Sequence, residues 1–264
     1  MTFSAASAVV RASDRTWKAE VLPDWDIFGI SNGGYLMAIA ARAMSEAGDG
    51  RLPVSVTAHF TRPVSAGAVT IDVDTVKVGK SLSTMRAVLS TEREALTLLG
   101  TLATPESVRD EVIYSSAEPP EMPPPEDCVR ALPGVNTPLP PPLMAQFEER
   151  IHPEDASALE GKPTGVARVR GWFRLHDDEP LDAFAPLLVA DAFPPAIFNS
   201  GLPLSWTPTV EMTTQIRSVP STEWLRCRFV TRFVTGGLLE EDGEIWDENG
   251  RLVALSRQLA LVPR

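Results

Sequence analysis

The chain has 264 residues, 44% hydrophobic and 22% charged, which is long and apolar enough to bury one large core or two small ones. Its net charge of −11 argues against a nucleic-acid-binding protein, because a phosphate backbone requires a basic face. Cys128 and Cys227 lie far apart without metal-ligand spacing, so we predict neither a disulfide framework nor a metal site. No signal-peptide pattern or bilayer-length apolar run is present, which predicts a soluble, cytoplasmic protein without membrane insertion.

The first half of the chain is predicted to contain one helix and an antiparallel sheet. A short strand over residues 17–21 precedes Asn32-Gly33-Gly34, after which apolar residues recur at helical spacing until Gly48. This spacing predicts an amphipathic helix. Four segments with alternating or β-branched residues follow, and they predict the strands of the sheet: VSVTAHF, AVTIDVDTVKV, SLSTMRAVLS and ALTLLGTLA.

A proline-rich stretch separates this half from the second. It contains PPEMPPPED and TPLPPP, and proline is not tolerated in a central strand or a helix interior. We therefore predict an N-terminal domain over residues 1–117, a linker over 118–143 and a C-terminal domain over 144–264, with the candidate catalytic residues in the C-terminal domain.

The second half repeats the order of elements seen in the first. Strands are predicted near residues 147–151 and 166–175, then a helix from about Leu181, then four strand segments: PTVEMTTQI, EWLRCRFVTRFV, LLEEDGEIW and RLVALSRQLALV. The same spacing separates Gly79 from Thr101 and Gly236 from Gln258, which indicates a degenerate duplication. We predict an α+β fold of two antiparallel sheets, each wrapped around a long helix, that can pair edge to edge.

Two motifs at the start of the first helix are candidates for chemistry. Gly29-Ile30-Ser31-Asn32-Gly33 matches the G-x-S-x-G nucleophile elbow, but the preceding residues are too few to supply the parallel sheet that such an elbow requires. Gly33 and Gly34 leave backbone N–H groups uncovered at the positive end of the helix, where they are able to hold an oxyanion. The alternative is that both glycines only permit a turn or a close helix contact.

Asp191 is the strongest candidate in the second half. It follows Leu187 by four residues and Leu188 by three, so a helix would carry it on the same apolar stripe and aim a carboxylate at the core. A buried carboxylate needs hydrogen bonds, a charged partner or a task. Either a structural or a catalytic role fits that position.

Thr209 and Gln258 are candidates to act with Asp191. Thr209 opens the strand after the Asp191 helix, and the alternation of the last strand places Gln258 on one face with Ala254, Ser256 and Ala260. Each residue alone is an ordinary polar strand residue. A carboxylate, a hydroxyl and an amide together are able to position a water molecule. The acidic run at 240–242 is expected to be a solvated edge or turn.

These residues resemble the double hot-dog acyl-CoA thioesterases of the thioesterase II family over nearly the whole chain. In the first half the likeness lies in the glycine-pair helix start and in His59-Phe60-Thr61-Arg62-Pro63. In the second half it lies in Leu187-Leu188-Val189-Ala190-Asp191, in Thr209 and in Gln258.

The resemblance implies a tandem hot-dog fold that hydrolyses an acyl-CoA to a carboxylic acid and coenzyme A without a cofactor. It implies that Asp191 is the base for a water molecule, that Thr209 and Gln258 are its hydrogen-bonding partners, and that the N–H of Gly33 or Gly34 binds the oxyanion. A homodimer or homotetramer is also expected, since sheet edges and helices of such folds often join further copies.

The chain departs from the family at two places. Glu211-Met212 stands where the family often has Asp-His soon after the threonine, and Pro194-Pro195 follows Asp191 and is expected to kink the helix or fix the direction of the carboxylate. Three other functions remain open: a non-catalytic acyl-CoA-binding or sensor protein, a hydratase or dehydratase with an Asp/His pair, and an esterase that uses Ser31.

Overall fold

The computed structural model describes the chain except for residues 108–111, 113, 132–140, 177–178, 203–205 and 263–264. The helices are α1 (Phe3–Ala6), α2 (Gly33–Ala47), α3 (Ala185–Val189) and the 3-10 turns η1 (Pro105–Ser107), η2 (Pro125–Asp127), η3 (Pro142–Ala145), η4 (Ala156–Glu160) and η5 (Ala196–Ser200). The strands in the first half are β1 (Val10–Arg11), β2 (Thr16–Val21), β3 (Asp26–Ile27), β4 (Ile30–Ser31), β5 (Leu52–Phe60), β6 (Gly67–Val78), β7 (Leu82–Ser90) and β8 (Glu94–Ala103). Those in the second half are β9 (Val129–Arg130), β10 (Phe147–Ile151), β11 (Arg168–Leu175), β12 (Thr209–Ile216), β13 (Leu225–Val230), β14 (Val234–Thr235), β15 (Leu238–Asp247) and β16 (Leu252–Leu261). No helix in these described ranges is long and apolar enough to cross a membrane.

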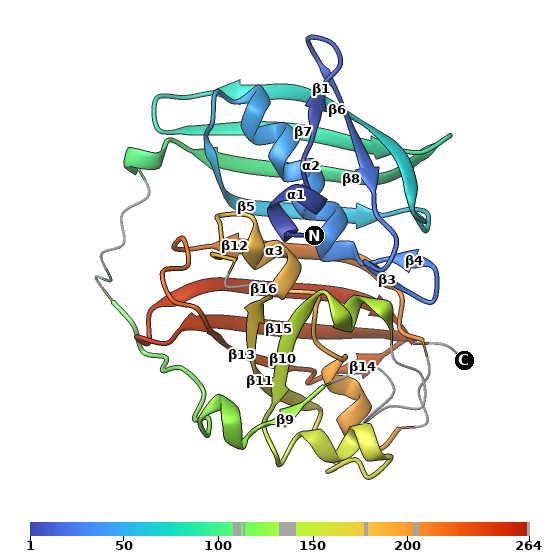
Figure 1. Ribbon diagram of the computed structural model, residues 1–264, viewed down its shortest axis with the longest axis vertical. Helices are drawn as coiled ribbons and strands as arrows, with labels where there is room; N and C mark the ends of the chain where they lie inside the picture. The colour runs from blue at the N-terminus through green and yellow to red at the C-terminus, as the bar shows by residue number, and fades with distance from the viewer. Residues whose placement is uncertain (108–111, 113, 132–140, 177–178, 203–205, 263–264) are drawn as a thin grey trace.

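One continuous antiparallel sheet runs through both halves. Its order is β1-β2-β6-β7-β8-β5-β12-β16-β15-β13-β11-β10-β9, and the two halves meet where β5 pairs with β12 (Figure 1). The two predicted sheets are therefore joined edge to edge into one. Each half would leave a long strand edge with unpaired N–H and C=O groups, and pairing β5 with β12 satisfies both edges. A hydrogen bond of 2.9 Å between the hydroxyls of Thr57 and Thr213 also crosses this junction.

The strand order supports the internal duplication that the sequence indicates. Outward from the junction, β5-β8-β7-β6-β2 in the first half matches β12-β16-β15-β13-β11 in the second. Every pair in both series is antiparallel. The predicted strands of both halves are confirmed, and β8 and β16, which carry Thr101 and Gln258, occupy matching positions.

Helix α2 has the predicted bounds but is buried on nearly all sides. The side chain of Asn32 accepts a hydrogen bond of 2.9 Å from the N–H of Tyr35 and caps its start, and Gly48 caps its end. It packs on strands β2, β5, β6, β7 and β8, and α3 also contacts it. The amphipathic prediction is thus incomplete, because α3 and the N-terminal segment around α1 cover the side of α2 that the sheet leaves open.

Helix α3 is much shorter than the long second helix predicted from the sequence. The carboxylate of Asp182 accepts hydrogen bonds from the N–H groups of Phe184 and Ala185 and sets its start. The helix ends at Val189, before Asp191, and the turn η5 begins after Pro194-Pro195. Proline lacks an N–H and restricts the residue before it, so this pair prevents the helix from continuing.

The segment predicted to be a linker adds a strand to the edge of the sheet. Within residues 118–143, β9 pairs with β10, and the carbonyl of Pro123 accepts a hydrogen bond of 2.8 Å from the indole N–H of Trp172. The described part of this segment therefore packs against the second half. Its prolines lie outside β9, as the absence of a proline N–H requires.

Glu149 on β10 is a buried acid without a partner. It is 1% exposed, and neither carboxylate oxygen has a hydrogen-bond partner. Burial raises the pKa of Glu149 well above its usual value. Its neighbour Glu148 lies on the opposite face of the strand. Burial also raises the pKa of Glu148, but hydrogen bonds from Arg174 and Arg150 outweigh that effect and lower it.

Replacing Glu149→Met should raise the free energy of unfolding at neutral pH by about 1–2 kcal/mol, because it removes the desolvation cost of an unsatisfied group. An acid whose pKa is raised in the folded state destabilises that state increasingly as pH rises above the unfolded pKa of about 4.3. Urea unfolding at acidic and at neutral pH should show that the variant lacks the part of the decrease in unfolding free energy with rising pH that Glu149 causes in the wild type. The matched Glu148→Met change should lower stability because it removes a carboxylate that binds Arg150 and Arg174. A destabilised Glu149→Met would contradict the expected effect.

Candidate active site

The carboxylate of Asp191 lies at the start of α2, although it comes from the other half of the chain. The side-chain N–H₂ of Asn32 donates to its Oδ2 at 2.9 Å and to its backbone carbonyl at 2.7 Å. The N–H of Gly34 donates to Oδ2 at 3.0 Å. The Asn32 amide thus caps α2 with its oxygen and holds Asp191 with its nitrogen. The sequence interpretation missed Asn32 as a site residue, although an asparagine directly before a helix is a preferred N-cap.

The glycine pair allows this close approach of the two segments. A Cβ on Gly34 would overlap the carbonyl oxygen of Leu187 and lie 3.0 Å from the Cβ of Asp191. A Cβ on Gly33 would lie 2.8 Å from the ring of Phe60 and 3.0 Å from the Asp191 carboxylate. Gly34 therefore has both features considered for the motif: it permits a close contact with α3, and its N–H donates to the Asp191 carboxylate. The oxyanion role of Gly33 and Gly34 stays a prediction, and in this structure Asp191 engages the Gly34 N–H.

The environment of Asp191 raises the pKa of its carboxylate toward neutral pH. The side chain is partly exposed at the surface of the turn after α3. Desolvation raises its pKa to about 6, although the N–H groups of Gly34 and Gly33 and the amide of Asn32 act to lower it. A general base is most effective when its pKa lies near the operating pH.

Thr209 and Gln258 form a hydrogen-bonded pair on neighbouring strands. The side-chain N–H₂ of Gln258 donates to the hydroxyl of Thr209. A register shift between Thr209 and Glu211 pairs Thr209 with Ala260, whereas regular pairing would place Val210 there. Because side chains alternate along a strand, this bulge turns Thr209 onto the same face as Gln258.

Glu211 and Met212, which replace the Asp-His of the family pattern, lie in different surroundings from Thr209. Met212 is fully buried, and the Glu211 carboxylate accepts a hydrogen bond of 2.9 Å from the hydroxyl of Thr213. Thr213 in turn faces Thr57 at the junction of the halves. Glu211 therefore points away from the face that carries Thr209 and Gln258.

Glu241 is a further acid at this site that the sequence interpretation missed. The run at 240–242 was expected to be solvated, but Glu241 lies on β15, is 8% exposed and stands directly opposite Gln258 in register. The N–H of Ala196 donates to its Oε2 at 2.6 Å. Desolvation raises the pKa of Glu241 to about 7, the Ala196 N–H lowers it, and the charges of Asp191 and Glu240 add to the rise.

The structure gathers the predicted residues into two hydrogen-bonded groups. Asp191 joins Gly34 and Asn32, and Thr209 joins Gln258. Within the described residues, no hydrogen bond links Asp191 directly to Thr209 or Gln258. Glu241 connects the two groups, because it lies opposite Gln258 and is close enough to Asp191 for their charges to interact.

Ser31 has none of the surroundings of an activated nucleophile. It lies on β4, which pairs with β3 in a small antiparallel sheet, and among the described residues its buried hydroxyl has no hydrogen-bond partner. A nucleophile elbow requires a parallel sheet and a base in contact with the hydroxyl. The elbow motif at Ser31 is therefore a strand end that leads into the Asn32 cap.

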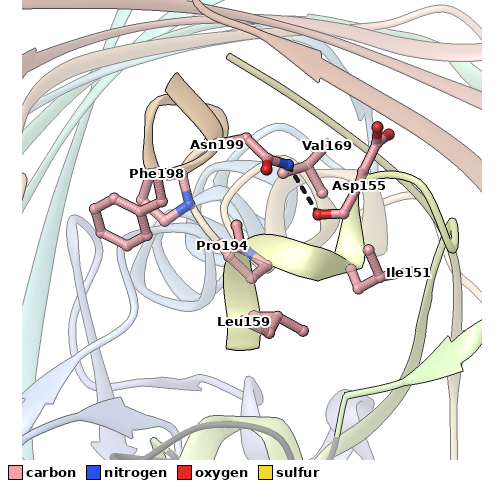
Figure 2. Close-up of a pocket in the computed structure, with 9 residues that line it drawn as sticks. Ile151, Asp155, Leu159, Val169, Pro194, Phe198 and Asn199 are labelled. Carbon is pink, nitrogen blue, oxygen red and sulfur yellow. Dashed lines mark hydrogen bonds between the residues drawn. The ribbon is translucent and has the colours of Figure 1, made fainter. Parts of the chain in front are cut away.

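A small apolar cavity lies beside the segment that follows Asp191. It measures about 50 Å³ and is lined by Ile151, Asp155, Ala158, Leu159, Val169, Pro194, Pro195, Phe198 and Asn199 (Figure 2). The side chain of Asn199 lies along one wall, and its N–H₂ donates a hydrogen bond of 2.8 Å to the carbonyl of Asp155. A cavity of this size has room for a few water molecules, so it is too small for an extended acyl chain without movement of its walls.

Comparison with known proteins gives consistent matches along the chain. Residues 21–104 match the model of the acyl-CoA thioesterase N-terminal domain, and residues 118–262 match that of the acyl-CoA thioesterase C-terminal domain. An uncharacterized protein from Mycobacterium tuberculosis is 29% identical, and the match covers 94% of this chain and 91% of that protein.

Solved structures give the same fold. A Thermobifida fusca protein provisionally described as a thioesterase II has a TM-score of 0.90 and 32% identity, covering 100% of this chain and 98% of its own. An Alicyclobacillus acidocaldarius protein of unknown function with a hot-dog fold has a TM-score of 0.85 and 21% identity, with 99% and 98% covered. The chain has an α+β hot-dog fold.

Proposed function

Since the chain belongs to the acyl-CoA thioesterase family and is a thioester hydrolase, we propose that it hydrolyses an acyl-CoA with a water molecule held by Asp191, Thr209 and Gln258. The observation that carries this proposal is the Asp191 carboxylate, which is partly exposed, bound by Asn32 and Gly34, and close to neutral in pKa. This carboxylate is able to accept a proton from water at neutral pH.

The proposed reaction is a direct attack by water on the thioester carbonyl. Asp191 takes one proton from the water as its oxygen bonds to the carbonyl carbon, and Thr209 and Gln258 orient that oxygen. The tetrahedral intermediate then collapses, the carbon–sulfur bond breaks, and the proton passes from Asp191 to the departing thiolate. The products are a carboxylic acid and coenzyme A.

The two halves contribute unequally to this site. We interpret each half as one hot-dog unit, with α2 of the first supplying Gly34 and Asn32 and the second supplying Asp191, Thr209 and Gln258. The first helix carries no acid between Gly33 and Ser45, so the arrangement supports one site per chain. The Gly34 N–H orients Asp191 in this proposal, and oxyanion binding by the N–H of Gly33 or Gly34 remains part of it. Assembly as a homodimer or homotetramer remains part of the proposal.

The first test is release of coenzyme A from short, medium, long and aromatic acyl-CoAs, followed with a thiol reagent. Turnover of any class supports the proposed reaction, and the preferred class gives the acyl group. Tight acyl-CoA binding without turnover would replace it with the non-catalytic binding protein. Inhibition by a serine-directed reagent would instead favour Ser31.

Thr209→Val should lower kcat by about ten- to a hundred-fold, because it removes one of the groups that orient the water. The measurement is steady-state hydrolysis of the preferred acyl-CoA. Thr213→Val is the matched control, since it makes the same change on the same strand but on the face that meets Thr57. Equal losses in the two variants would show that the effect comes from the strand and not from the Thr209 hydroxyl.

The rate should fall in acid as Asp191 becomes protonated. With a pKa of about 6 for Asp191, kcat/KM at about pH 5 should be about one-tenth of the value expected with Asp191 fully ionised, since one pH unit below a pKa leaves about one-tenth of the base form. The raised pKa of Asp191 means that acid does not cost stability through this group. Circular dichroism at the same pH should therefore report a folded protein. A flat rate down to that pH would contradict the assignment of Asp191 as base.

A further inference from the structure

Glu241 ties the segment that carries Asp191 to the sheet. The backbone N–H of Ala196 donates a hydrogen bond of 2.6 Å to Oε2 of Glu241. Ala196 is the first residue of η5 and follows Pro194-Pro195. The prolines leave little freedom in the connection back to Asp191. A change in the Glu241 side chain is therefore transmitted to the position of the Asp191 carboxylate.

The same side chain lies next to the other two proposed site residues. Glu241 and Gln258 are opposite each other on β15 and β16, both on the inner face, and such pairs have Cβ atoms about 4.5–5.5 Å apart. Gln258 in turn contacts Thr209. Glu241 is thus an acid that interacts with the charge of Asp191 on one side and stands opposite Gln258 on the other.

The charges around Glu241 disfavour its ionised form. The charge of Asp191, in the turn after α3, acts on Glu241, and so does that of Glu240, which precedes it on its own strand. Arg257 and Arg232 are bound to Asp242 on the opposite face of β15. Two adjacent carboxylates in a desolvated site do not both ionise readily, so the pair holds one proton over a range of pH.

We propose that Glu241 is a positioning residue of the proposed hydrolytic site, and that in its protonated form it holds the Asp191 turn against Gln258 while Asp191 is ionised. This inference rests on the proposed function. Ionisation of Glu241 places a second negative charge beside Asp191, pushes the turn away from β15 and opposes the negative charge that develops on the attacked thioester. Hydrolysis therefore needs an ionised Asp191 and a neutral Glu241.

The test is the pH dependence of kcat/KM in the full-length protein with Glu241→Gln. Glutamine keeps the size of the side chain and an oxygen for the Ala196 N–H, but it stays neutral. The wild type should give a bell-shaped profile that falls above neutral pH, about ten-fold for each pH unit, and the variant should keep the acid limb and lose the alkaline one. Glu149→Gln, the same change at a buried acid on β10, should keep both limbs.

A second measurement follows the protonation of Glu241 without the need for substrate turnover. One component of the infrared carbonyl band of protonated carboxylic acids should disappear as the wild type is titrated through neutral pH, and Glu241→Gln should lack that component, whereas the contribution of Glu149 is common to both proteins. If the wild type turns over substrate and Glu241→Gln keeps the same alkaline fall in rate, the proposed role of Glu241 is overturned. Absence of turnover by the wild type on every acyl-CoA would overturn the proposed function itself. A Glu241→Gln profile without the limb, with Glu149→Gln unchanged, supports the inference.

Discussion

Asp191→Asn is expected to lower kcat for acyl-CoA hydrolysis by about a thousand-fold while the protein stays folded, since general acid–base groups contribute about 10²–10⁴-fold. Asparagine keeps an oxygen for the Gly34 N–H and has nearly the size of aspartate, but it does not take a proton from water. KM should change little, because the substrate still finds the same surface. The measurement is coenzyme A release under saturating substrate, with thermal unfolding followed in parallel.

The control for this change is an acid outside the site. Asp72→Asn alters an exposed residue of β6 that accepts a hydrogen bond from Thr16, and it should leave kcat unchanged. Asp191→Glu keeps the charge but moves it by one methylene, so it should retain more activity than the asparagine variant and less than the wild type. Full activity of Asp191→Asn would remove Asp191 from the mechanism and leave its carboxylate as a structural link between α2 and α3.

The polar residues of the site differ in how far their positions follow from local sequence. The apolar spacing around Leu187 and Leu188 was enough to single out Asp191, although the helix that was expected to carry it ends at Val189. Glu241 carried a similar signal, because it alternates with the buried Leu239 and Ile245 on one strand. The charge of its neighbours Glu240 and Asp242 concealed that alternation and favoured a solvated turn.

Other features depend on contacts between distant segments. Thr209 reaches the inner face only through a bulge, and a one-residue change in register is set by the partner strand and not by the strand's own pattern. The union of two sheets into one depends in the same way on the pairing of β5 with β12. Local periodicity indicates which residues form strands. The register of β12 on β16 and the pairing of β5 with β12 are instead set when the folded chain satisfies the exposed strand edges.

Gly34→Ala is expected to reduce both stability and activity, with a loss of about 3 kcal/mol in the free energy of unfolding, at the upper end for overpacked sites. The added methyl group would overlap the carbonyl oxygen of Leu187, and a backbone atom inside a helix does not move aside as the end of a side chain does. To relieve the overlap, α3 must shift away from α2. That shift also separates Asp191 from the Gly34 N–H.

Comparison with Gly100→Ala separates this effect from a general intolerance of added methyl groups. A Cβ at Gly100 would lie 2.9 Å from the sulfur of Met44, an unbranched and flexible side chain that is able to rearrange, so this variant should lose little stability and keep its kcat. For Gly34→Ala, urea unfolding should show the lower stability. Hydrolysis below the unfolding range should show a drop in kcat of at least about ten-fold, because a displaced base is poorly aligned with its water. Lower stability with normal kcat would mean that Asp191 keeps its place without Gly34, and that Asn32 alone is enough to hold it.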